Sequence, residues 1–149
     1  VSTITTLVLD GSAALVGTAT TTVTNGFIFG ANVLNVANTG TLDCGGNVTL
    51  NNADSKLLFS AAGSVDGAVV VSATPNTGKG IDVDVSGATL NGNLTLDSSA
   101  NINIATNSTF FYEAATVDIS NNDSLTLTGA GTTSVLQGAH NLQISNTGN

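Results

Sequence analysis

Residues 94–106 read LTLDSSANINIAT, and residues 117–129 read VDISNNDSLTLTG. When the second segment is placed over the first, apolar-polar-apolar triplets coincide throughout, and Asn, Ser or Asp occurs in both connectors. Alternation with a period of two residues is typical of a short strand that buries one face. A unit that recurs after 20 to 25 residues indicates a stack of repeats, each burying its face against the next. The two segments therefore predict a β-solenoid.

Similar triplets recur along the rest of the chain. They begin at residues 7, 27, 48, 69, 94, 117 and 142, so successive starts lie 20 to 25 residues apart. This spacing fits three short sides per coil, with parallel pairing between strands of successive coils. We therefore predict that residues 1–149 form one all-β domain, a single-stranded three-sided parallel β-helix of about six coils. The inward side chains should form aliphatic columns, one through Val48, Leu94 and Val117 and the next through Leu50, Leu96 and Ile119.

The composition narrows the range of partners. Two basic residues, both Lys, stand against ten acidic residues, for a formal net charge of −8. Such a chain lacks the cations that hold phosphates or anionic lipid headgroups, which argues against nucleic acid as a partner. Only 8% of the residues are charged, compared with about 25% in an ordinary soluble domain. A surface so poor in charge suits a protein covered by copies of itself, or a sparsely charged monomer.

Cysteine usage and hydropathy say little about cellular location. Cys44 is the single cysteine, so no intramolecular disulfide can form, and we expect it to be a small buried hydrophobic residue. An intermolecular disulfide is the alternative. No run of 18 apolar residues occurs, so we expect no insertion into a membrane as a helix. The sequence starts at Val1, which fits removal of a leader or excision from a longer chain.

One stretch departs from the repeat. Residues 72–80 contain the single proline, two glycines and a lysine, at a position where neighbouring coils have only a short corner. We expect this stretch to leave the stack as an insertion loop before the core resumes at Ile81. Irregular insertions on solenoids often carry binding contacts. The candidate ligand-binding residues of the loop are Thr74, Pro75, Asn76 and Lys79.

Catalytic signatures are weak in this sequence. His140 is the single histidine, so a Ser-His-Asp site would have to be built around it, and a surface or corner position is the simpler interpretation. Asp82 and Asp84 form the best acidic pair, because the two-residue period puts them on one outward face about 7 Å apart. Solenoid lyases and glycosidases carry acids on such a face, but a solvated acidic surface is the simpler explanation. We expect a protein that is not an enzyme.

Metal binding has limited support. Zinc sites need several His or Cys ligands, and this chain has one of each. Oxygen ligands for calcium are plentiful, but Asp123 has Ala100 at its aligned position, so the acids are not expected to stack. We therefore expect no cofactor, with a structural calcium ion as the alternative. The carboxylates available for calcium would be Asp82, Asp84, Asp97, Asp118 and Asp123.

A regular array of threonine hydroxyls would point to ice binding. Thr49 and Thr95 occupy equivalent positions in their coils. The coil between them has Val70 at this position, and the coil after Thr95 has Asp118. The array therefore stops after single rungs, and we expect no ice-binding surface.

Several short strings resemble the repeats of a known group of proteins. They are Gly40-Thr41-Leu42, Gly46-Asn47-Val48-Thr49-Leu50, Ala61-Ala62-Gly63-Ser64-Val65 and Gly92-Asn93-Leu94-Thr95-Leu96. They resemble bacterial surface β-solenoids, in particular autotransporter passengers such as rickettsia-type outer-membrane surface antigens, from about residue 25 onward. The resemblance implies a right-handed β-helix displayed outside a bacterial cell, in adhesion or as a surface coat.

The two ends of the solenoid point to a function. A solenoid exposes unpaired strand edges and an apolar cross-section at each end. We expect no capping helix. Uncapped ends that differ from each other generate open filaments, so we expect a structural subunit of an extracellular or cell-surface fibre, a homopolymer stacked head to tail. The apolar residues expected at the ends are Ile4, Leu7 and Leu9 on one side and Leu142 and Ile144 on the other.

Two further functions remain open at the level of sequence. The first alternative is an adhesin or a glycan-binding, autotransporter-like passenger segment, which would contact a host surface or a glycan through residues 72–80. The second is a polysaccharide-active solenoid enzyme. Deleting the loop would separate the fibre from the adhesin, since a fibre should still assemble and an adhesin should lose its ligand.

Overall fold

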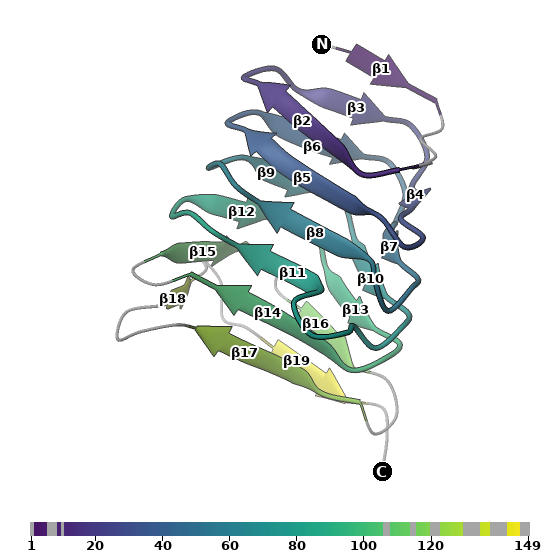
Figure 1. Cartoon of the computed structure of the whole chain (residues 1–149), viewed down its shortest axis with the longest axis vertical. Coiled ribbons are helices and arrows are strands. Elements are labelled where there is room, and N and C mark those ends of the chain that lie inside the picture. Colours follow the sequence, from purple (N-terminus) through teal and green to yellow (C-terminus); the bar gives the residue numbers. More distant parts are fainter. Residues whose placement is uncertain are drawn as a thin grey trace.

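The computed structural model describes residues 2–5, 9, 11–105, 108–113, 116–119, 123–129, 135–137 and 143–146. These residues contain no helix and form 19 strands, stacked in three parallel sheets (Figure 1). The sheets have seven, six and six strands, and the chain visits them in turn. The structure therefore confirms the predicted fold, an all-β, three-sided parallel β-helix. In the part of the chain that is described, no helix has the length and apolar character to cross a membrane.

The three sheets are here called A, B and C. Sheet A consists of β1 (Ser2–Ile4), β3 (Thr21–Val23), β6 (Thr41–Cys44), β9 (Ser64–Asp66), β12 (Ala88–Leu90), β15 (Thr109–Tyr112) and β18 (Val135–Gln137). Sheet B consists of β4 (Phe27–Ile28), β7 (Val48–Leu50), β10 (Val69–Val71), β13 (Leu94–Leu96), β16 (Thr116–Ile119) and β19 (Gln143–Asn146). Sheet C consists of β2 (Ala13–Gly17), β5 (Val33–Asn38), β8 (Lys56–Phe59), β11 (Gly80–Val83), β14 (Ala100–Ile104) and β17 (Leu125–Gly129).

Sheet B shows the stacking most clearly. Its six strands are separated by five turns of the solenoid. From β7 to β16, each strand places its inward residues directly over those of the strand before. Both predicted aliphatic columns are confirmed, and all of their side chains are buried. The first column contains Val48, Val69, Leu94 and Val117, and the second contains Leu50, Val71, Leu96 and Ile119.

The repeat is displaced in sheet C. The sequence alignment places Leu125 over Ile102, whereas in the structure Ile102 pairs with Leu127 and Leu125 pairs with Ala100. The alignment is therefore wrong by two residues in this sheet, because the connection before β17 is longer than the one before β14. A shift of two residues keeps the same side chains on the inner face, so the alternation alone did not reveal it.

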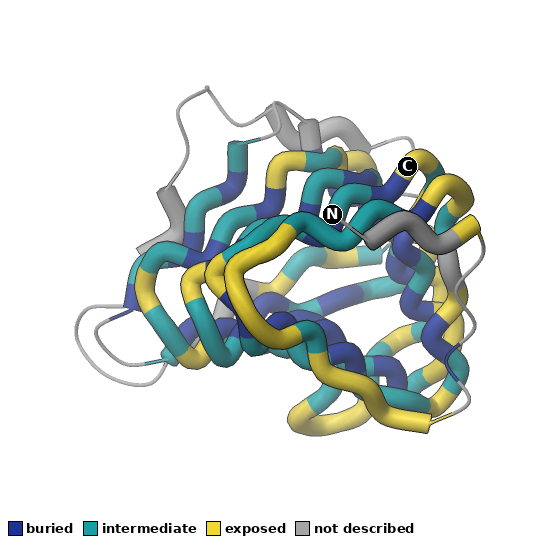
Figure 2. Tube along the Cα trace, turned by 90° about the horizontal axis from the view of Figure 1, so that it is seen from above, coloured by how far each residue is buried: buried dark blue, intermediate teal, exposed yellow. Residues whose placement is uncertain are grey.

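Alternating side chains fill the interior of the solenoid. Along β5, Leu34 and Val36 are buried while Asn35 between them is half-buried, and Figure 2 shows the same alternation around the tube. Phe59 and Phe110 meet across the interior, with ring centroids 5.4 Å apart and ring planes at 50°. Burial of one such side chain contributes roughly 1.5 to 3 kcal/mol. The stacked interior is therefore the main source of stability.

Polar side chains hold the corner between sheets B and C. Asn32 donates from Nδ2 to the carbonyl oxygens of Leu9 and Phe29, each at 2.9 Å. In the next turn, the buried Ser55 donates from Oγ to the carbonyl oxygen of Gly30 at 2.6 Å. These bonds satisfy carbonyl groups that lie outside the strand ladders. They also fix the row of corners in which the next connection, residues 72–79, is found.

Candidate functional site

The connection between β10 and β11 is the largest irregularity in this row of corners. It comprises residues 72–79, whereas the same connection comprises residues 51–55 in the turn before and residues 97–99 in the turn after. The chain reverses through Gly78, which has a φ of +74°, and Lys79 N donates to Asn76 O at 3.0 Å. A positive φ is easily adopted only by glycine. The loop therefore folds back over the outer face of sheet C.

Hydrogen bonds attach the loop to the turns on both sides. Toward the preceding turn, Asn76 N donates to Ala53 O at 2.8 Å, and Asn76 Nδ2 donates to Asp54 Oδ1 at 3.1 Å. Toward the following turn, the loop accepts a bond at Lys79 O from Asn101 Nδ2 at 3.2 Å. Backbone and side-chain bonds to two neighbouring turns hold the loop in one position over the sheet.

Gly80 lets the loop lie close to the sheet. This residue has a φ of +92°, and a Cβ atom placed on it would lie 2.9 Å from Asn101 Oδ1 and 3.2 Å from Pro75 Cγ. Neither distance leaves room for a side chain without movement. Pro75 therefore occupies the space that a side chain at position 80 would take.

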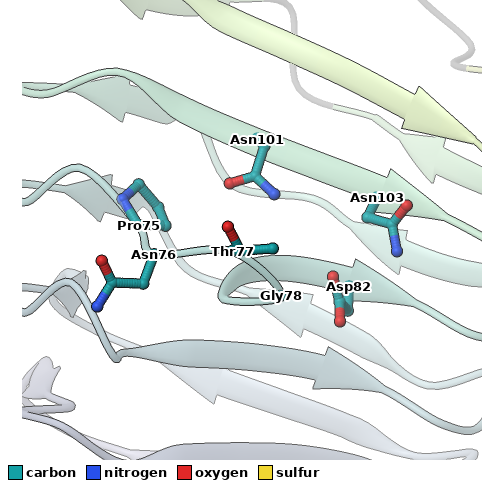
Figure 3. A pocket seen from close by; sticks show the side chains of 7 residues that line it. All are labelled: Pro75, Asn76, Thr77, Gly78, Asp82, Asn101 and Asn103. Carbon is teal, nitrogen blue, oxygen red and sulfur yellow. The ribbon is translucent and has the colours of Figure 1, made fainter.

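A pocket of about 420 Å³ lies between the loop and the outer face of β11 and β14 (Figure 3). We call it the loop pocket. Asp82 and Asn103 are paired neighbours on these two strands and form part of its floor. Its volume lies within the roughly 300 to 1,000 Å³ of small-molecule sites. The lining residues are Pro75, Asn76, Thr77, Gly78, Asp82, Asn101 and Asn103.

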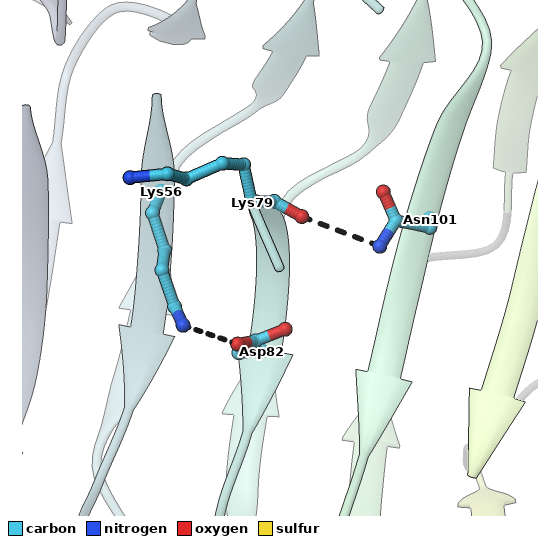
Figure 4. A network of polar contacts seen from close by, with 4 residues as sticks. All are labelled: Lys56, Lys79, Asp82 and Asn101. Carbon is cyan, nitrogen blue, oxygen red and sulfur yellow. Dashed lines mark hydrogen bonds and ion pairs between the residues drawn. The ribbon is translucent and has the colours of Figure 1, made fainter. Parts of the chain in front are cut away.

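Asp82 is the one charged residue among those that line this pocket. The residue is 7% exposed, and its Oδ2 atom forms an ion pair with Lys56 Nζ from β8 (Figure 4). Its other oxygen, Oδ1, is buried and has no hydrogen-bond partner in the protein. Figure 4 shows this oxygen on the side away from Lys56, toward β14. A buried acceptor without a donor costs about 1 to 3 kcal/mol, so a ligand hydroxyl that reached Oδ1 would remove this cost.

The structure corrects the prediction for the two outward acids. Asp82 and Asp84 were expected to share a solvated face. Asp82 instead lies under the loop, while Asp84 follows the end of β11, is exposed, and donates from its backbone N to Phe59 O at 2.9 Å. The two-residue period correctly predicts that the Asp82 side chain faces outward, but it does not predict that the loop covers this side chain. Among the described carboxylates, Asp82 alone lines the loop pocket.

The loop residues singled out by sequence take different positions at the site. Pro75 and Asn76 line the loop pocket, and Lys79 takes part through its carbonyl oxygen. Thr74 lines a second hollow of about 180 Å³, which we call the corner pocket. Its lining residues are Thr74, Pro75, Ser99, Ala100, Asn101, Ser124 and Thr126.

Sequence reasoning missed the floor of the site. Thr77, Asn101 and Asn103 were not selected, although Asn101 and Asn103 alternate with buried residues on β14 and so must face outward. The two lysines of the sequence could also have indicated the site. Lys56 and Lys79 are the only basic residues of the chain, and both lie at this site.

The remaining chemical candidates do not form a site. Cys44 is buried, as predicted, and burial together with the neighbouring Asp43 raises the pKa of its thiol to about 11. The expected alignment of Asp123 with Ala100 is wrong, because Ala100 pairs with Leu125, and Asp123 Oδ1 accepts a hydrogen bond from Ser99 Oγ at 3.1 Å. Among the described residues, no three His, Cys, Asp or Glu side chains gather as metal ligands. His140 lies outside the described residues.

The threonine positions on sheet B follow the predicted register. Thr49 pairs with Val70, Val70 with Thr95, and Thr95 with Asp118. A valine and an aspartate therefore interrupt the hydroxyls on successive rungs. The outer face of sheet B carries no continuous threonine array over these four strands.

The residues expected to mediate end-to-end contact are described only in part. Ile4 lies in β1 and Ile144 in β19, each the outermost strand of its sheet among the described strands. Leu9 is buried at 9% exposure. Leu7 and Leu142 lie outside the described residues. Self-association through these residues stays a prediction.

Searches against protein-family models, characterised proteins and solved structures found no match for this chain. The parallel β-solenoid is shown by the structure itself. The likeness to autotransporter passengers therefore stays a resemblance of composition and period.

Proposed function

We propose that this protein is a carbohydrate-binding module of the adhesin type, which binds a neutral glycan in the loop pocket. The observation that carries this proposal is Asp82, a nine-tenths buried carboxylate whose Oδ1 atom lacks a donor within the protein. Asn76, Thr77 and Asn103 line the same pocket and add amide and hydroxyl groups to it. Sites that hold ligands by a few polar groups in a formed hollow are typical of small-molecule recognition.

The charges around the pocket favour a neutral ligand. Lys56 neutralises Asp82 through the ion pair, and neither lysine of the site is among the residues that line the pocket, so the lining presents hydrogen-bonding groups but no cation for an anionic ligand. The chain as a whole carries a net charge of −8. A long-range negative field raises the energy of an approaching anion. Hydroxyl groups of a neutral sugar can donate to Asp82 and both donate to and accept from amides.

Binding without cleavage is part of the proposal. Glycoside hydrolysis generally uses two carboxyl groups on either side of the scissile bond. Asp82 is the one carboxylate among the described residues that line the pocket, and its charge is engaged by Lys56. A glycan-binding role also suits a location outside the cell or at its surface, where the partner would be a host surface or glycan. The resemblance to bacterial surface solenoids agrees with this location.

The test compares two chemically identical substitutions. Asp82→Asn removes the buried acceptor charge, whereas Asp84→Asn makes the same change at an exposed position outside the pocket. The ligands are cello-, malto-, manno- and chito-oligosaccharides, with oligogalacturonates as the anionic series, and affinity is measured by isothermal titration calorimetry. A hydrogen bond to a charged group contributes about 1.5 to 3 kcal/mol. Asp82→Asn should therefore weaken binding of a neutral oligosaccharide roughly 10- to 100-fold.

A second variant guards against loss of fold. Asp82→Asn also removes the partner of Lys56, so a melting curve must accompany it. Thr77→Val keeps the shape of an exposed loop residue and removes only its hydroxyl. This variant should bind the same oligosaccharide more weakly, while its melting temperature stays unchanged. The proposal is wrong if no neutral oligosaccharide binds, or if Asp82→Asn and Asp84→Asn bind equally well.

End-to-end assembly into a fibre is the second candidate function. Leu15 in β2 and Leu125 in β17 are partly buried side chains that contact the core. These strands are the two outermost strands of sheet C, and the inward residues of the four strands between them are buried. The apolar core of sheet C thus reaches solvent on both sides of the described stack. Another copy could continue the ladder by adding a parallel strand.

Electron microscopy and light scattering test the fibre directly. Wild-type protein at high concentration should form filaments, and Leu15→Lys should prevent them by placing a charge at the junction. Val16→Lys is the matched control, because Val16 is 76% exposed and lies beside Leu15 on the outward side of the same strand. Monodisperse monomer at high concentration would contradict this second proposal and leave the first untouched.

A further inference from the structure

The loop pocket and the corner pocket are neighbouring hollows. Both are lined by Pro75 and Asn101, which stand between them. The corner pocket, at about 180 Å³, is smaller than the roughly 300 Å³ of the smallest ordinary small-molecule sites. It is therefore better explained as an extension of the loop pocket than as a separate site.

The two pockets lie along β14 and the residue before it. Asn103 and Asn101 on β14 lie in the loop pocket, and Asn101, Ala100 and Ser99 lie in the corner pocket. At about 3.3 Å per residue, the path from Asn103 to Ser99 measures roughly 13 Å. A hollow of this length along a strand suits a chain of linked rings better than a single ring.

The residues that line the two pockets are uncharged apart from Asp82, which is paired with Lys56. Asn101 is held in place, because its Nδ2 atom donates to Lys79 O at 3.2 Å. The corner pocket adds the hydroxyl groups of Ser124 and Thr126, both exposed. Pro75 offers an apolar ring face between the two pockets. Alternation of hydroxyl or amide groups with an apolar face matches the surface of a neutral sugar, which has hydroxyl edges and C–H faces.

We propose that the site binds an extended neutral oligosaccharide along β14, with one end in the loop pocket beside Asp82 and the next units in the corner pocket. This inference rests on the proposed carbohydrate-binding function and adds the length and direction of the ligand. The loop pocket provides the anchoring position. The corner pocket provides affinity only for ligands long enough to pass Pro75.

A chain-length series tests the inference. Affinities are measured for the best-binding neutral series of the panel, from the monosaccharide to the hexasaccharide. The affinity should rise at least tenfold between one and three or four units and then level off. Thr126→Phe places a bulky ring in the corner pocket, so the ratio of tetrasaccharide to monosaccharide affinity should fall to about one. Thr95→Phe, an outward change on sheet B away from the site, should leave the wild-type ratio.

The outcomes separate the two proposals. If the neutral oligosaccharides bind but the affinity does not depend on length, the extended site is wrong and the carbohydrate-binding function stands. The same conclusion follows if Thr126→Phe keeps the wild-type ratio with an unchanged melting temperature. If none of the neutral oligosaccharides binds, both proposals are wrong.

Discussion

Two connections in the same row of corners, residues 97–99 and residues 72–79, differ in what they do to the outer face of sheet C. The short connection leads directly from β13 into β14 and leaves Asn101 and Asn103 half-buried. The long one folds back over β11 and covers Asp82 to 7% exposure. In these two turns, the outward residue that follows the long connection is buried, and those that follow the short connection are half-buried.

The inward residues of sheet C are equally buried after the short and the long connection. Ile81 pairs with Ile102 and Val83 with Ile104, and all four side chains are buried whichever connection precedes their strand. Since the cost of closing a flexible loop rises only slowly with its length, an insertion of this kind is cheap. The interior therefore carries the stability and the insertion carries the candidate site, and each part can be altered with little effect on the other.

The largest expected effect comes from the interior. Leu96→Ala removes a fully buried side chain from the second column of sheet B. Large-to-small changes at such positions cost about 2 to 5 kcal/mol, and the loss should appear in denaturant unfolding as a lower midpoint. Thr95→Ala in the same strand faces outward and should change stability by less than about 0.5 kcal/mol. Equal stabilities of the two variants would show that Leu96 is not part of a packed core.

A smaller effect is expected where the loop rests on the sheet. Gly80→Ala forces an alanine into a φ of +92° and toward Pro75 and Asn101, whereas Gly78→Ala meets the same kind of backbone restriction with no atom within 4 Å. Each should lose about 1 to 3 kcal/mol from the strained backbone. Gly80→Ala alone should also displace the loop and abolish oligosaccharide binding. If both variants bind as wild type does, close contact at Gly80 does not shape the pocket.

A third prediction uses the pH dependence of stability to test the burial of Cys44 in the interior. Burial and Asp43 raise the pKa of Cys44 to about 11 from an ordinary value near 9.0. Because the folded protein keeps this proton when the unfolded chain has lost it, stability should fall as the pH rises from about 9 to 11. The slope from one proton is at most about 1.4 kcal/mol per pH unit. Cys44→Ala should flatten the decline, and an unchanged slope in that variant would contradict the assignment.

The sequence was sufficient for the scaffold because the scaffold depends on periodicity. Val48, Leu94 and Val117 lie in one column since each opens a triplet after a short corner, and side-chain alternation fixes which face is inward. The same rule did not give the pairing of Leu125, because moving a strand by two residues leaves the inward face unchanged. Register in that sheet depends on the conformation of the connection, which the alternation does not encode.

The sequence predicts the loop side of the candidate site but not its floor on β11 and β14. The departure from the repeat at residues 72–80 drew attention to Pro75 and Asn76, which do line the pocket. The alternation predicts a solvated Asp82, because nothing local in the sequence shows in which direction an insertion folds. That direction depends on tertiary contacts, namely the bonds from Asn76 to Asp54 and from Asn101 to Lys79.

The smallest expected effect on stability, and the sharpest test of the comparison, is an exchange of the two connections. Residues 72–79 are replaced by Asp-Ser-Ser, the sequence of residues 97–99. The interior of sheet C is unaltered, and an exposed ion pair is worth about 0 to 1 kcal/mol, so the unfolding free energy should change by no more than about 1 kcal/mol. Asp82 becomes a solvated acid beside Lys56, and oligosaccharide binding should be lost.

A fibre held by end-to-end stacking should still form, because Leu15 and Leu125 lie at the outermost strands of sheet C and not at this corner. Retained binding in this variant would place the glycan site elsewhere on the solenoid, and a large loss of stability would show that the loop belongs to the scaffold.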